Sequence, residues 1–384
     1  MSLTDIAYVV CSALFGSDIE VELINDIVKD TLRFELPMLR MSENMFALEL
    51  FHGPTGTFKD IGARFLANII GYFLKNNSKT DGVVNLLVAT KGDTGSAVSS
   101  AFADMPGVNV FIFHPSGKEL RVPEHITPVM APNIIPVEVR GTLEDCQTIV
   151  RQAYEDDELN ARLHLTSANS INIARLLPQT FFFFIAYARL KAMGINTDKL
   201  VVSMPCGNLG NLTAALLSKK MGLPIHRFMA AGIGQERLWG EMQGGLLSVN
   251  HTKRKALSTN LSRINNLIEN DASLSQLVDC YTYNDNEIAE QISLMRSAHN
   301  YVMDRNTAMA CRAVTENLKS DEVGVFLATA HPAMYASRLK EILGINLLSS
   351  SSVRQRLFVD RYAPISPTLP AVKHFLLDSV KHLI

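Results

Sequence analysis

Apolar residues follow two different periods along this chain of 384 residues. Up to about residue 35 they recur at helical spacing, as in Ile6, Val10 and Leu14. From residue 45 onward, short apolar and β-branched runs alternate with segments of helical length. Continuous apolar runs of this kind are typical of strands that are buried on both faces of a parallel sheet. The pattern therefore predicts an α/β fold behind a helical start.

The apolar runs predict seven strands, at residues 45–50, 83–90, 108–115, 134–139, 199–205, 226–232 and 324–332. Helices are predicted between them and after the last one, and the alternation restarts after a phenylalanine-rich helix at 177–190. Residues 249–271 are polar and predict an irregular surface excursion, and residues 347–353 predict a linker. We therefore expect a helical segment at 1–45 and two α/β domains, at 46–178 and 179–384.

Composition and charge narrow the possible partners. The chain is 47% hydrophobic and carries a net charge of -2, so nothing favours binding to nucleic acid or to an anionic membrane. Five scattered cysteines without a CxxC pair argue against a disulfide framework and a zinc site. The longest apolar run is too short to span a bilayer. The sequence predicts a cytoplasmic protein without a metal, and leaves open whether it is a monomer or a homodimer.

Polar turns follow three of the predicted strands, two of them with glycine, and ligands bind at the carboxyl ends of strands in open α/β sheets. Gly92 to Gly95 start a helix that Asp93 or Thr94 is expected to cap, and its N–H groups suit a carboxylate or a phosphate. Gly207 to Gly210 form a second turn, which suits a phosphate. Thr329 ends the last strand. Each turn alone is explained about as well by an ordinary connection between a strand and a helix.

A lysine stands where an apolar side chain is expected. In "LFHGPTGTFKDIGARFL", Lys59 opens a helix whose following stripe is apolar. Thr57 and Phe58 separate it from Gly56, so the stretch is not a nucleotide-binding P-loop. An amine, a phosphate cradle and a strand-end hydroxyl are together the parts of a pyridoxal-phosphate site. We expect the Lys59 side chain to be dry and uncharged.

Five motifs carry a resemblance to a known family. They are "ELFHGPTGTFKD", "ATKGDTGSAV", "TSANSINIARLLPQ", "PCGNLGNLTA" and "FLATAHPA", in this order along the chain. The chain resembles the threonine synthase family of pyridoxal-phosphate enzymes. The resemblance implies the two-domain architecture of fold type II, like the tryptophan synthase β-subunit, with the active site between the domains. It also implies conversion of O-phospho-L-homoserine and water to L-threonine and phosphate.

The resemblance also implies roles for individual residues. Lys59 matches the lysine that forms an aldimine with the cofactor. The other residues that match cofactor-binding positions are Asp60, Gly207, Asn208, Leu209, Gly210, Asn211 and Thr329. The residues that match positions near the substrate carboxylate or phosphate are Gly92, Asp93, Thr94, Gly95, Asn169, Ser170 and Arg175.

The chain departs from the family pattern mainly around the substrate. Lys91 and Cys206 stand where the family has serine, and Asn306 stands where it has histidine. Residues 230–240 also lack the asparagines and the aspartate of the family. Three readings follow: a working threonine synthase, a related pyridoxal-phosphate lyase with another amino-acid substrate, or a catalytically idle relative with a binding role.

Overall fold

The protein is seen in a computed structural model, which describes residues 1–76, 83–90, 92–116, 131–169, 172–232, 258–345 and 363–381. Contacts between residues divide the chain into two compact units. The first unit consists of Met1–Phe58 and Leu176–Leu348, and the second unit of Lys59–Arg175 and Ser349–Ile384. In the described ranges each unit contains one sheet, so the two are described separately.

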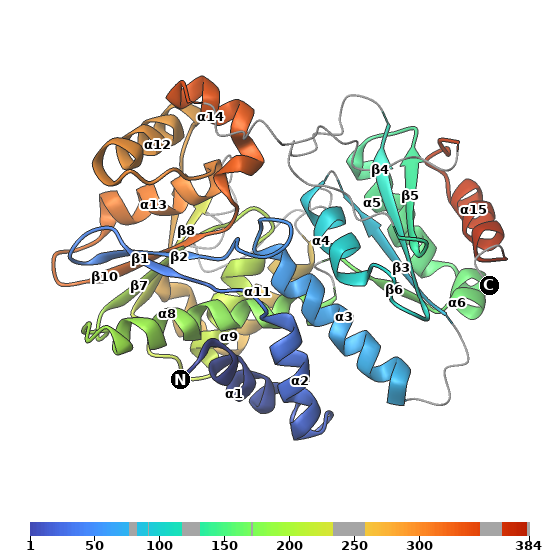
Figure 1. Cartoon of the computed structure of the whole chain (residues 1–384), viewed down its shortest axis with the longest axis horizontal. Coiled ribbons are helices and arrows are strands. Elements are labelled where there is room, and N and C mark those ends of the chain that lie inside the picture. Colours follow the sequence, from blue (N-terminus) through green and yellow to red (C-terminus); the bar gives the residue numbers. More distant parts are fainter. Residues whose placement is uncertain are drawn as a thin grey trace. The chain divides into compact units, whose positions relative to one another are not determined.

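The first unit is built on a six-stranded sheet in the order β1-β2-β10-β7-β8-β9. All neighbouring strands run parallel except β1, which pairs with β2 in the antiparallel sense. Figure 1 shows α13 on one face of this sheet and α8 and α9 on the other. The strands are β1 (Met38–Arg40), β2 (Met45–Glu49), β7 (Leu200–Pro205), β8 (Arg227–Gly232), β9 (Val278–Thr282) and β10 (Val323–Ala328).

The phenylalanine-rich helix α8 is buried at its start, where Phe181, Phe182 and Phe183 are almost inaccessible to solvent, and is exposed at its last residues. The α-helices are α1 (Leu3–Phe15), α2 (Val21–Thr31), α8 (Phe181–Ala192), α9 (Gly210–Lys220), α11 (Ser258–Asn270), α12 (Asp285–His299), α13 (Arg305–Asn317) and α14 (Ala336–Leu343). The 3-10 helices are η2 (Leu177–Thr180), η3 (Ala272–Leu277) and η4 (Pro332–Tyr335).

The second unit is built on a four-stranded, fully parallel sheet in the order β5-β4-β3-β6. Its core joins strand residues such as Phe111 to Ile149 of α5 and Leu376 of α15. Its strands are β3 (Val84–Ala89), β4 (Val108–Pro115), β5 (Ile134–Val139) and β6 (Leu165–Ser167). Its helices are α3 (Lys59–Asn76), α4 (Asp93–Phe102), α5 (Leu143–Glu155), α6 (Asp157–Leu163) and α15 (Leu369–Lys381), and α7 (Ile173–Leu176) ends at the boundary.

The seven predicted strands and the parallel α/β fold are confirmed, although the last strand ends at Ala328 rather than at residue 332. The prediction of an irregular excursion at 249–271 is wrong for its described part. That part forms α11, because Leu261 and Ile264 make a narrow apolar stripe that is buried within a mostly polar sequence. The predicted linker at 347–353 lies outside the described residues.

The compact units are discontinuous in sequence, whereas the predicted domains are continuous segments. Strand β2 lies inside the segment 46–178, but it pairs with β10 in the sheet of the first unit. Helix α15 lies inside the segment 179–384, but it packs on α5 in the second unit, where Lys373 pairs with Asp156 at 2.9 Å. Such long-range partners leave no local pattern. The division into a helical segment at 1–45 and domains at 46–178 and 179–384 stays a prediction.

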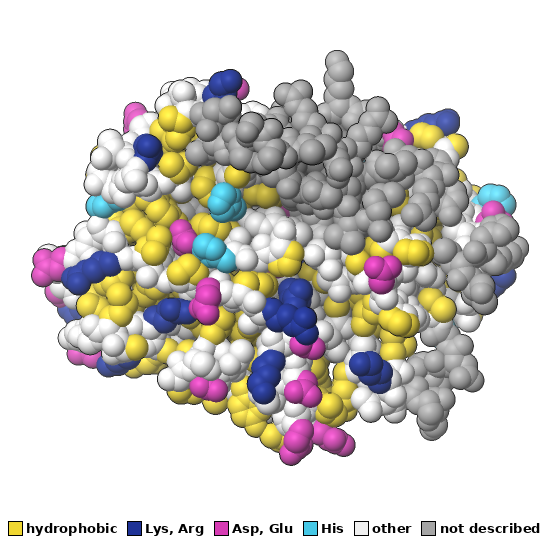
Figure 2. Space-filling view, viewed as in Figure 1, with side chains coloured by type: hydrophobic (Ala, Val, Ile, Leu, Met, Phe, Trp, Pro, Cys, Tyr) yellow, Lys and Arg dark blue, Asp and Glu magenta, His cyan; other side chains and the backbone are white. Residues whose placement is uncertain are grey.

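Charges on the surface are mixed. On the face drawn in Figure 2, acidic and basic side chains of the described residues are interspersed among hydrophobic ones, in keeping with the net charge of -2. In the part of the chain that the structure describes, no helix is both long enough and apolar enough to cross a membrane.

Candidate active site

The turn that precedes Lys59 is fixed to the end of β10. The Phe58 N–H donates to the carbonyl oxygen of Thr329 at 2.9 Å, and the His331 N–H donates to the carbonyl oxygen of Gly56 at 2.8 Å. Lys59 follows directly as the first residue of α3. Two main-chain hydrogen bonds therefore set where the chain enters the helix that carries the amine.

The Lys59 amine forms an ion pair with Asp93 in the second unit. Nζ lies 3.1 Å from Oδ2 of Asp93, which is the first residue of α4. The two side chains are 27% and 24% exposed. The expectation that the Lys59 side chain is dry is therefore wrong in this structure, since the side chain is partly exposed to solvent and paired with a carboxylate. The pair connects the first residues of α3 and α4.

Thr90, rather than Asp93 or Thr94, caps the start of α4. Its hydroxyl oxygen accepts the N–H groups of Gly92 at 3.0 Å and of Gly95 at 3.3 Å. Gly92 occupies the N-cap position and has no side chain to offer, so the predicted cap by Asp93 or Thr94 is wrong. Because Thr90 takes the capping role, the Asp93 carboxylate is available to hold Lys59.

Arg175 is buried against the start of α3. Its Nη1 donates to the carbonyl oxygen of Ala168 at 2.5 Å, and the Asp60 carboxylate is close enough to act on its charge. Burial lowers the pKa of Arg175 to about 10, and the negative charge of Asp60 opposes that shift. The guanidinium is therefore still cationic at neutral pH.

Asn169 lies at the end of β6, next to the end of β3. Its amide donates to the carbonyl oxygen of Ala89 at 3.4 Å, and β6 pairs with β3 in the sheet. Ser170, which is also predicted to bind substrate, lies outside the described residues. The second unit thus brings together seven of the predicted residues around the starts of α3 and α4, namely Lys59, Asp60, Gly92, Asp93, Gly95, Asn169 and Arg175.

Close packing at Gly62 leads to a stability prediction. A Cβ atom there would lie 2.7 Å from the carbonyl oxygen of Arg175, which is main chain and cannot yield easily. We expect Gly62→Ala to lower the free energy of unfolding by about 1–3 kcal/mol in urea titrations. Gly71 is a matched control on the same helix, because its Cβ would meet only the flexible end of Met105 at 2.8 Å.

For Gly71→Ala we expect little change, or a gain of up to about 1 kcal/mol from helix propensity. Equal effects of the two substitutions would contradict the importance of the contact between Gly62 and the Arg175 main chain.

The first unit contributes a tight loop between β7 and α9. Oδ1 of Asn208 accepts the Gly210 N–H at 3.1 Å, and the Asn260 amide donates to the Asn208 carbonyl oxygen at 2.9 Å. Leu209 is buried and has a left-handed backbone, with φ of 61°. The Asn211 amide donates back to the carbonyl oxygen of Pro205 at 3.3 Å. The loop therefore has one defined shape.

This loop fits a phosphate group. A Cβ at Gly210 would lie 3.2 Å from Oδ1 of Asn208 and 3.3 Å from Oε1 of Gln179, so any larger residue would crowd these two side chains. Gly207 and Asn208 are exposed at the tip, and the N–H groups of the first turn of α9 follow. A helix start of this kind favours an anion. The residues present fit the phosphate of pyridoxal phosphate.

Thr329 is buried at the next strand end. Its N–H donates to the hydroxyl oxygen of Thr307 at 3.2 Å, and Asp304 in turn accepts the Thr307 N–H at 3.2 Å. Because β10 pairs with β7, Thr329 and the 207–210 loop lie at the same edge of the sheet. Thr329, which matches a cofactor-binding position of the family, is therefore a neighbour of the loop at these strand ends.

Two of the single-residue departures from the family pattern lie among the described residues, and of the segment 230–240 only residues 230–232, at the end of β8, are described. Sγ of Cys206 is 3.7 Å from the carbonyl oxygen of Met204, and burial raises the pKa of the thiol. The Asn306 N–H donates to the capping carboxylate of Asp304 at 2.8 Å. Cys206 thus belongs to the segment that follows β7, and Asn306 to the first turn of α13. Lys91 lies outside the described residues.

Sequence reasoning missed two pairings, that of Lys59 with Asp93 and that of Glu49 with His52, whose side chains lie 2.6 Å apart. A signal existed for the second pair, since a glutamate ends an otherwise apolar strand three residues before a histidine. No local signal in the sequence predicts that Tyr301, which lies between α12 and α13, donates a hydrogen bond to the same glutamate.

Comparison with known proteins is consistent with this geometry. The profile of the pyridoxal-phosphate dependent enzyme family matches residues 33–329. Threonine synthase of Buchnera aphidicola subsp. Baizongia pistaciae is 35% identical over 96% of this chain and 86% of its own. That of Escherichia coli is 36% identical over 88% of this chain and 79% of its own.

Similarity in three dimensions leads to the same family. The crystal structure of threonine synthase from Escherichia coli matches with a TM-score of 0.85 and 31% identity, and the match covers 99% of this chain and 89% of that one. The PLP-bound threonine synthase from Brucella melitensis matches in fold with a TM-score of 0.80 and 24% identity, over 98% of this chain and 88% of that one. This chain therefore belongs to the threonine synthase family of pyridoxal-phosphate dependent enzymes and has their type II fold.

Proposed function

We propose that this protein acts as a threonine synthase, which converts O-phospho-L-homoserine and water into L-threonine and phosphate. The observation that carries the proposal is the placement of Lys59, which opens α3 immediately after a turn bonded to Thr329 and is paired with Asp93. An amine at the first residue of a helix, held by a carboxylate, suits pyridoxal-phosphate chemistry.

The proposed cofactor residues come from the loops described above. Pyridoxal phosphate, when bound, supplies a conjugated ring that takes up electrons from the substrate carbons. Lys59 would hold its aldehyde carbon, Asp60 would lie near its phenolic oxygen and Thr329 would face its ring nitrogen. Its phosphate would bind to the loop of Gly207, Asn208, Leu209, Gly210 and Asn211.

Lys59 is also the proposed proton carrier. As a free amine, Nζ takes the proton from the α carbon of the substrate and returns a proton later in the reaction. Asp93, 3.1 Å away, gives this amine a defined position whenever it is not bonded elsewhere. This role for Asp93 explains why a carboxylate is tolerated at a helix start that is proposed to bind the substrate carboxylate.

The proposed substrate residues divide into two groups. The N–H groups of Gly92 and Gly95 are already bonded to Thr90, so at the start of α4 we assign the substrate carboxylate to the N–H groups of Asp93 and Thr94. For the substrate phosphate we propose Asn169, Ser170 and Arg175, because a cationic guanidinium suits a phosphate group.

Release of phosphate from O-phospho-L-homoserine tests the proposal. We expect the native protein to release phosphate and form threonine, and we expect Arg175→Ala to lower kcat/KM about 10- to 100-fold, since it loses charge-assisted hydrogen bonds. Arg162→Ala is the matched control, because Arg162 is an exposed arginine of the same unit. It should leave kcat/KM unchanged.

Other outcomes would select the remaining readings. Turnover of another amino acid with a β or γ leaving group, without phosphate release from O-phosphohomoserine, would identify a related lyase. Absence of both cofactor binding and turnover would identify an idle relative. We further infer that the protein acts in the cytoplasm on a small phosphorylated amino acid, a partner that requires neither a basic surface nor a membrane segment.

A further inference from the structure

A buried carboxylate at the end of β2 holds two partners. Glu49 is the last residue of this strand, and its Oε2 lies 2.6 Å from Nε2 of His52. Its Oε1 accepts the hydroxyl of Tyr301 at 3.0 Å. Burial, and after it the negative charge of Glu49, raises the pKa of Tyr301, so the tyrosine stays protonated as a donor. Both oxygens of the carboxylate are therefore engaged, and its orientation is set.

The His52 ring is held on a second side by an aromatic contact. It stacks on Phe51, with ring centroids 4.9 Å apart, and Phe51 packs edge-on against His331 at 5.5 Å. The His52 side chain is 39% exposed. Among the described residues, Nδ1 of His52 has no hydrogen-bond partner. The imidazole thus has one nitrogen fixed by a carboxylate and the other directed to its surroundings.

The pair lies at the carboxyl ends of the parallel strands, which is where ligands bind in such sheets. Glu49 is aligned with Ala328 across β2 and β10, and Thr329 follows Ala328. β7, which leads into Gly207, is the next strand beyond β10. Since neighbouring strands are about 4.8 Å apart, the ends of β2 and β7 are about 10 Å apart. The Glu49–His52 pair, Thr329 and the phosphate-binding loop therefore all lie at the carboxyl ends of the parallel strands.

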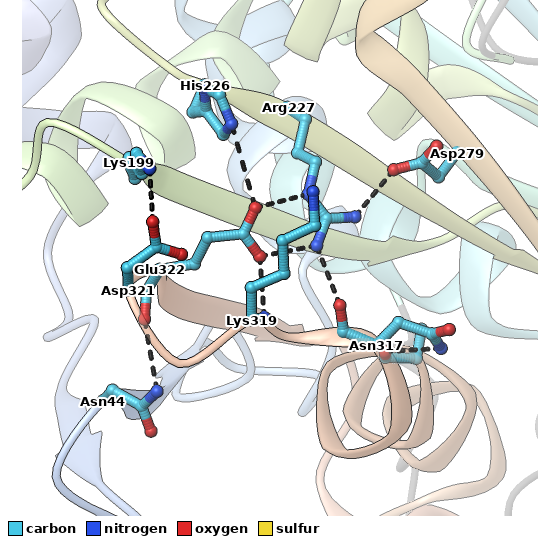
Figure 3. A network of polar contacts seen from close by, with 10 residues as sticks. Asn44, Lys199, His226, Arg227, Asp279, Asn317, Lys319, Asp321 and Glu322 are labelled. Atoms are coloured by element: carbon cyan, nitrogen blue, oxygen red, sulfur yellow. Dashed lines mark hydrogen bonds and ion pairs between the residues drawn. The ribbon is translucent and has the colours of Figure 1, made fainter.

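The same sheet offers a natural comparison. His226 lies 3.8 Å from the buried Glu322, but this second pair is at the opposite edge, where β8 and β10 begin (Figure 3). It belongs to a dense network of ion pairs that is remote from the strand ends carrying Thr329 and Gly207. One histidine–glutamate pair thus lies where the strands begin and the other where they end, and only the second of these is near the candidate site.

We propose that His52, oriented by Glu49, accepts the proton of the water that adds to the substrate; this rests on the proposed function. As the O–H bond breaks, the proton passes to Nδ1 and the oxygen bonds to the β carbon. Pyridoxal phosphate, when bound, would supply the conjugated system that takes up the π electrons of that carbon's double bond. The imidazolium then releases its proton to solvent. A carboxylate on Nε2 stabilises the imidazolium in between, as it does in hydrolase triads.

Product partition tests this role, because phosphate departs before water adds. We expect His52→Gln to release phosphate at a rate within about threefold of the native rate, and to form threonine about 100-fold more slowly. The unsaturated product that is not hydrated should appear as 2-oxobutanoate and ammonia, after tautomerisation and hydrolysis. His226→Gln, the matched control, should keep the native ratio of threonine to phosphate.

Two further variants keep the test decisive if His52→Gln folds poorly. Glu49→Gln preserves the shape of the side chain and should also lower the ratio of threonine to phosphate, and added imidazole should restore threonine formation in His52→Ala. A native ratio in His52→Gln or Glu49→Gln, or no rescue by imidazole, would overturn the inference while the proposed function stands. A native protein that releases no phosphate from O-phosphohomoserine would overturn both.

Discussion

Lys59→Ala is expected to abolish the visible absorbance of the protein in the presence of pyridoxal phosphate, and to lower turnover by about 10³-fold or more. The amine is the one group at the start of α3 that can bond to an aldehyde carbon, and alanine offers no replacement. Absorbance spectra of the purified protein, before and after addition of the cofactor, measure the first effect. Release of phosphate measures the second.

Lys75→Ala controls for the general loss of a lysine from the same helix. Lys75 is exposed in the last turn of α3, so its removal should change neither absorbance nor turnover. Loss of the Lys59–Asp93 pair should cost little stability, because partly exposed ion pairs contribute about 1 kcal/mol or less. A Lys59→Ala protein that kept the native absorbance band would contradict every role assigned to this amine.

The parts of the site that could be predicted are those with local signals. Buried parallel strands appear as apolar runs, and ligands bind where such strands end, so Thr329 and the 207–210 loop could be assigned to one edge from sequence. Lys59 could be singled out because a charged side chain is unusual at the start of an otherwise apolar helical stripe. The motifs then supplied the family, which the comparisons confirm.

The parts that could not be predicted depend on contacts between distant residues. Thr90 caps α4 because its hydroxyl reaches Gly95, five residues on, which left Asp93 available for Lys59, 34 residues away. Tyr301 reaches Glu49 across 252 residues. No periodicity records such pairs, and the same limit explains why the placement of β2 and α15 in their units was not foreseen.

The largest effect on stability is expected from substitution of Glu322, which lies where β10 of the six-stranded sheet begins (Figure 3). Its side chain is 1% exposed, and its two oxygens accept Nε of Arg227 at 2.8 Å and Nη2 at 2.6 Å. Arg227 also binds Asp279 at 2.6 Å and the carbonyl oxygen of Asn317 at 2.9 Å. We expect Glu322→Ala to lower the free energy of unfolding by about 3–5 kcal/mol, because it removes two charge-assisted hydrogen bonds from a guanidinium that is only 13% exposed.

The effect should depend on pH in a defined direction. Hydrogen bonds from Arg227 hold the pKa of Glu322 below its ordinary value of 4.5. A carboxylate of this kind contributes stability above its unfolded-state pKa, and the contribution is lost as the pH falls through the lowered pKa. The difference in unfolding free energy between the native protein and Glu322→Ala should therefore be full at neutral pH and shrink below about pH 4.5.

Two controls separate the buried pair from charge in general. Asp321 is the neighbouring residue and pairs with Lys199, but its side chain is 57% exposed, so Asp321→Ala should cost about 1 kcal/mol or less. The double variant Arg227→Met/Glu322→Leu should recover much of the stability lost in Glu322→Ala, since no buried charge is then left alone. Equal losses for Asp321→Ala and Glu322→Ala would show that burial does not set the strength of this ion pair.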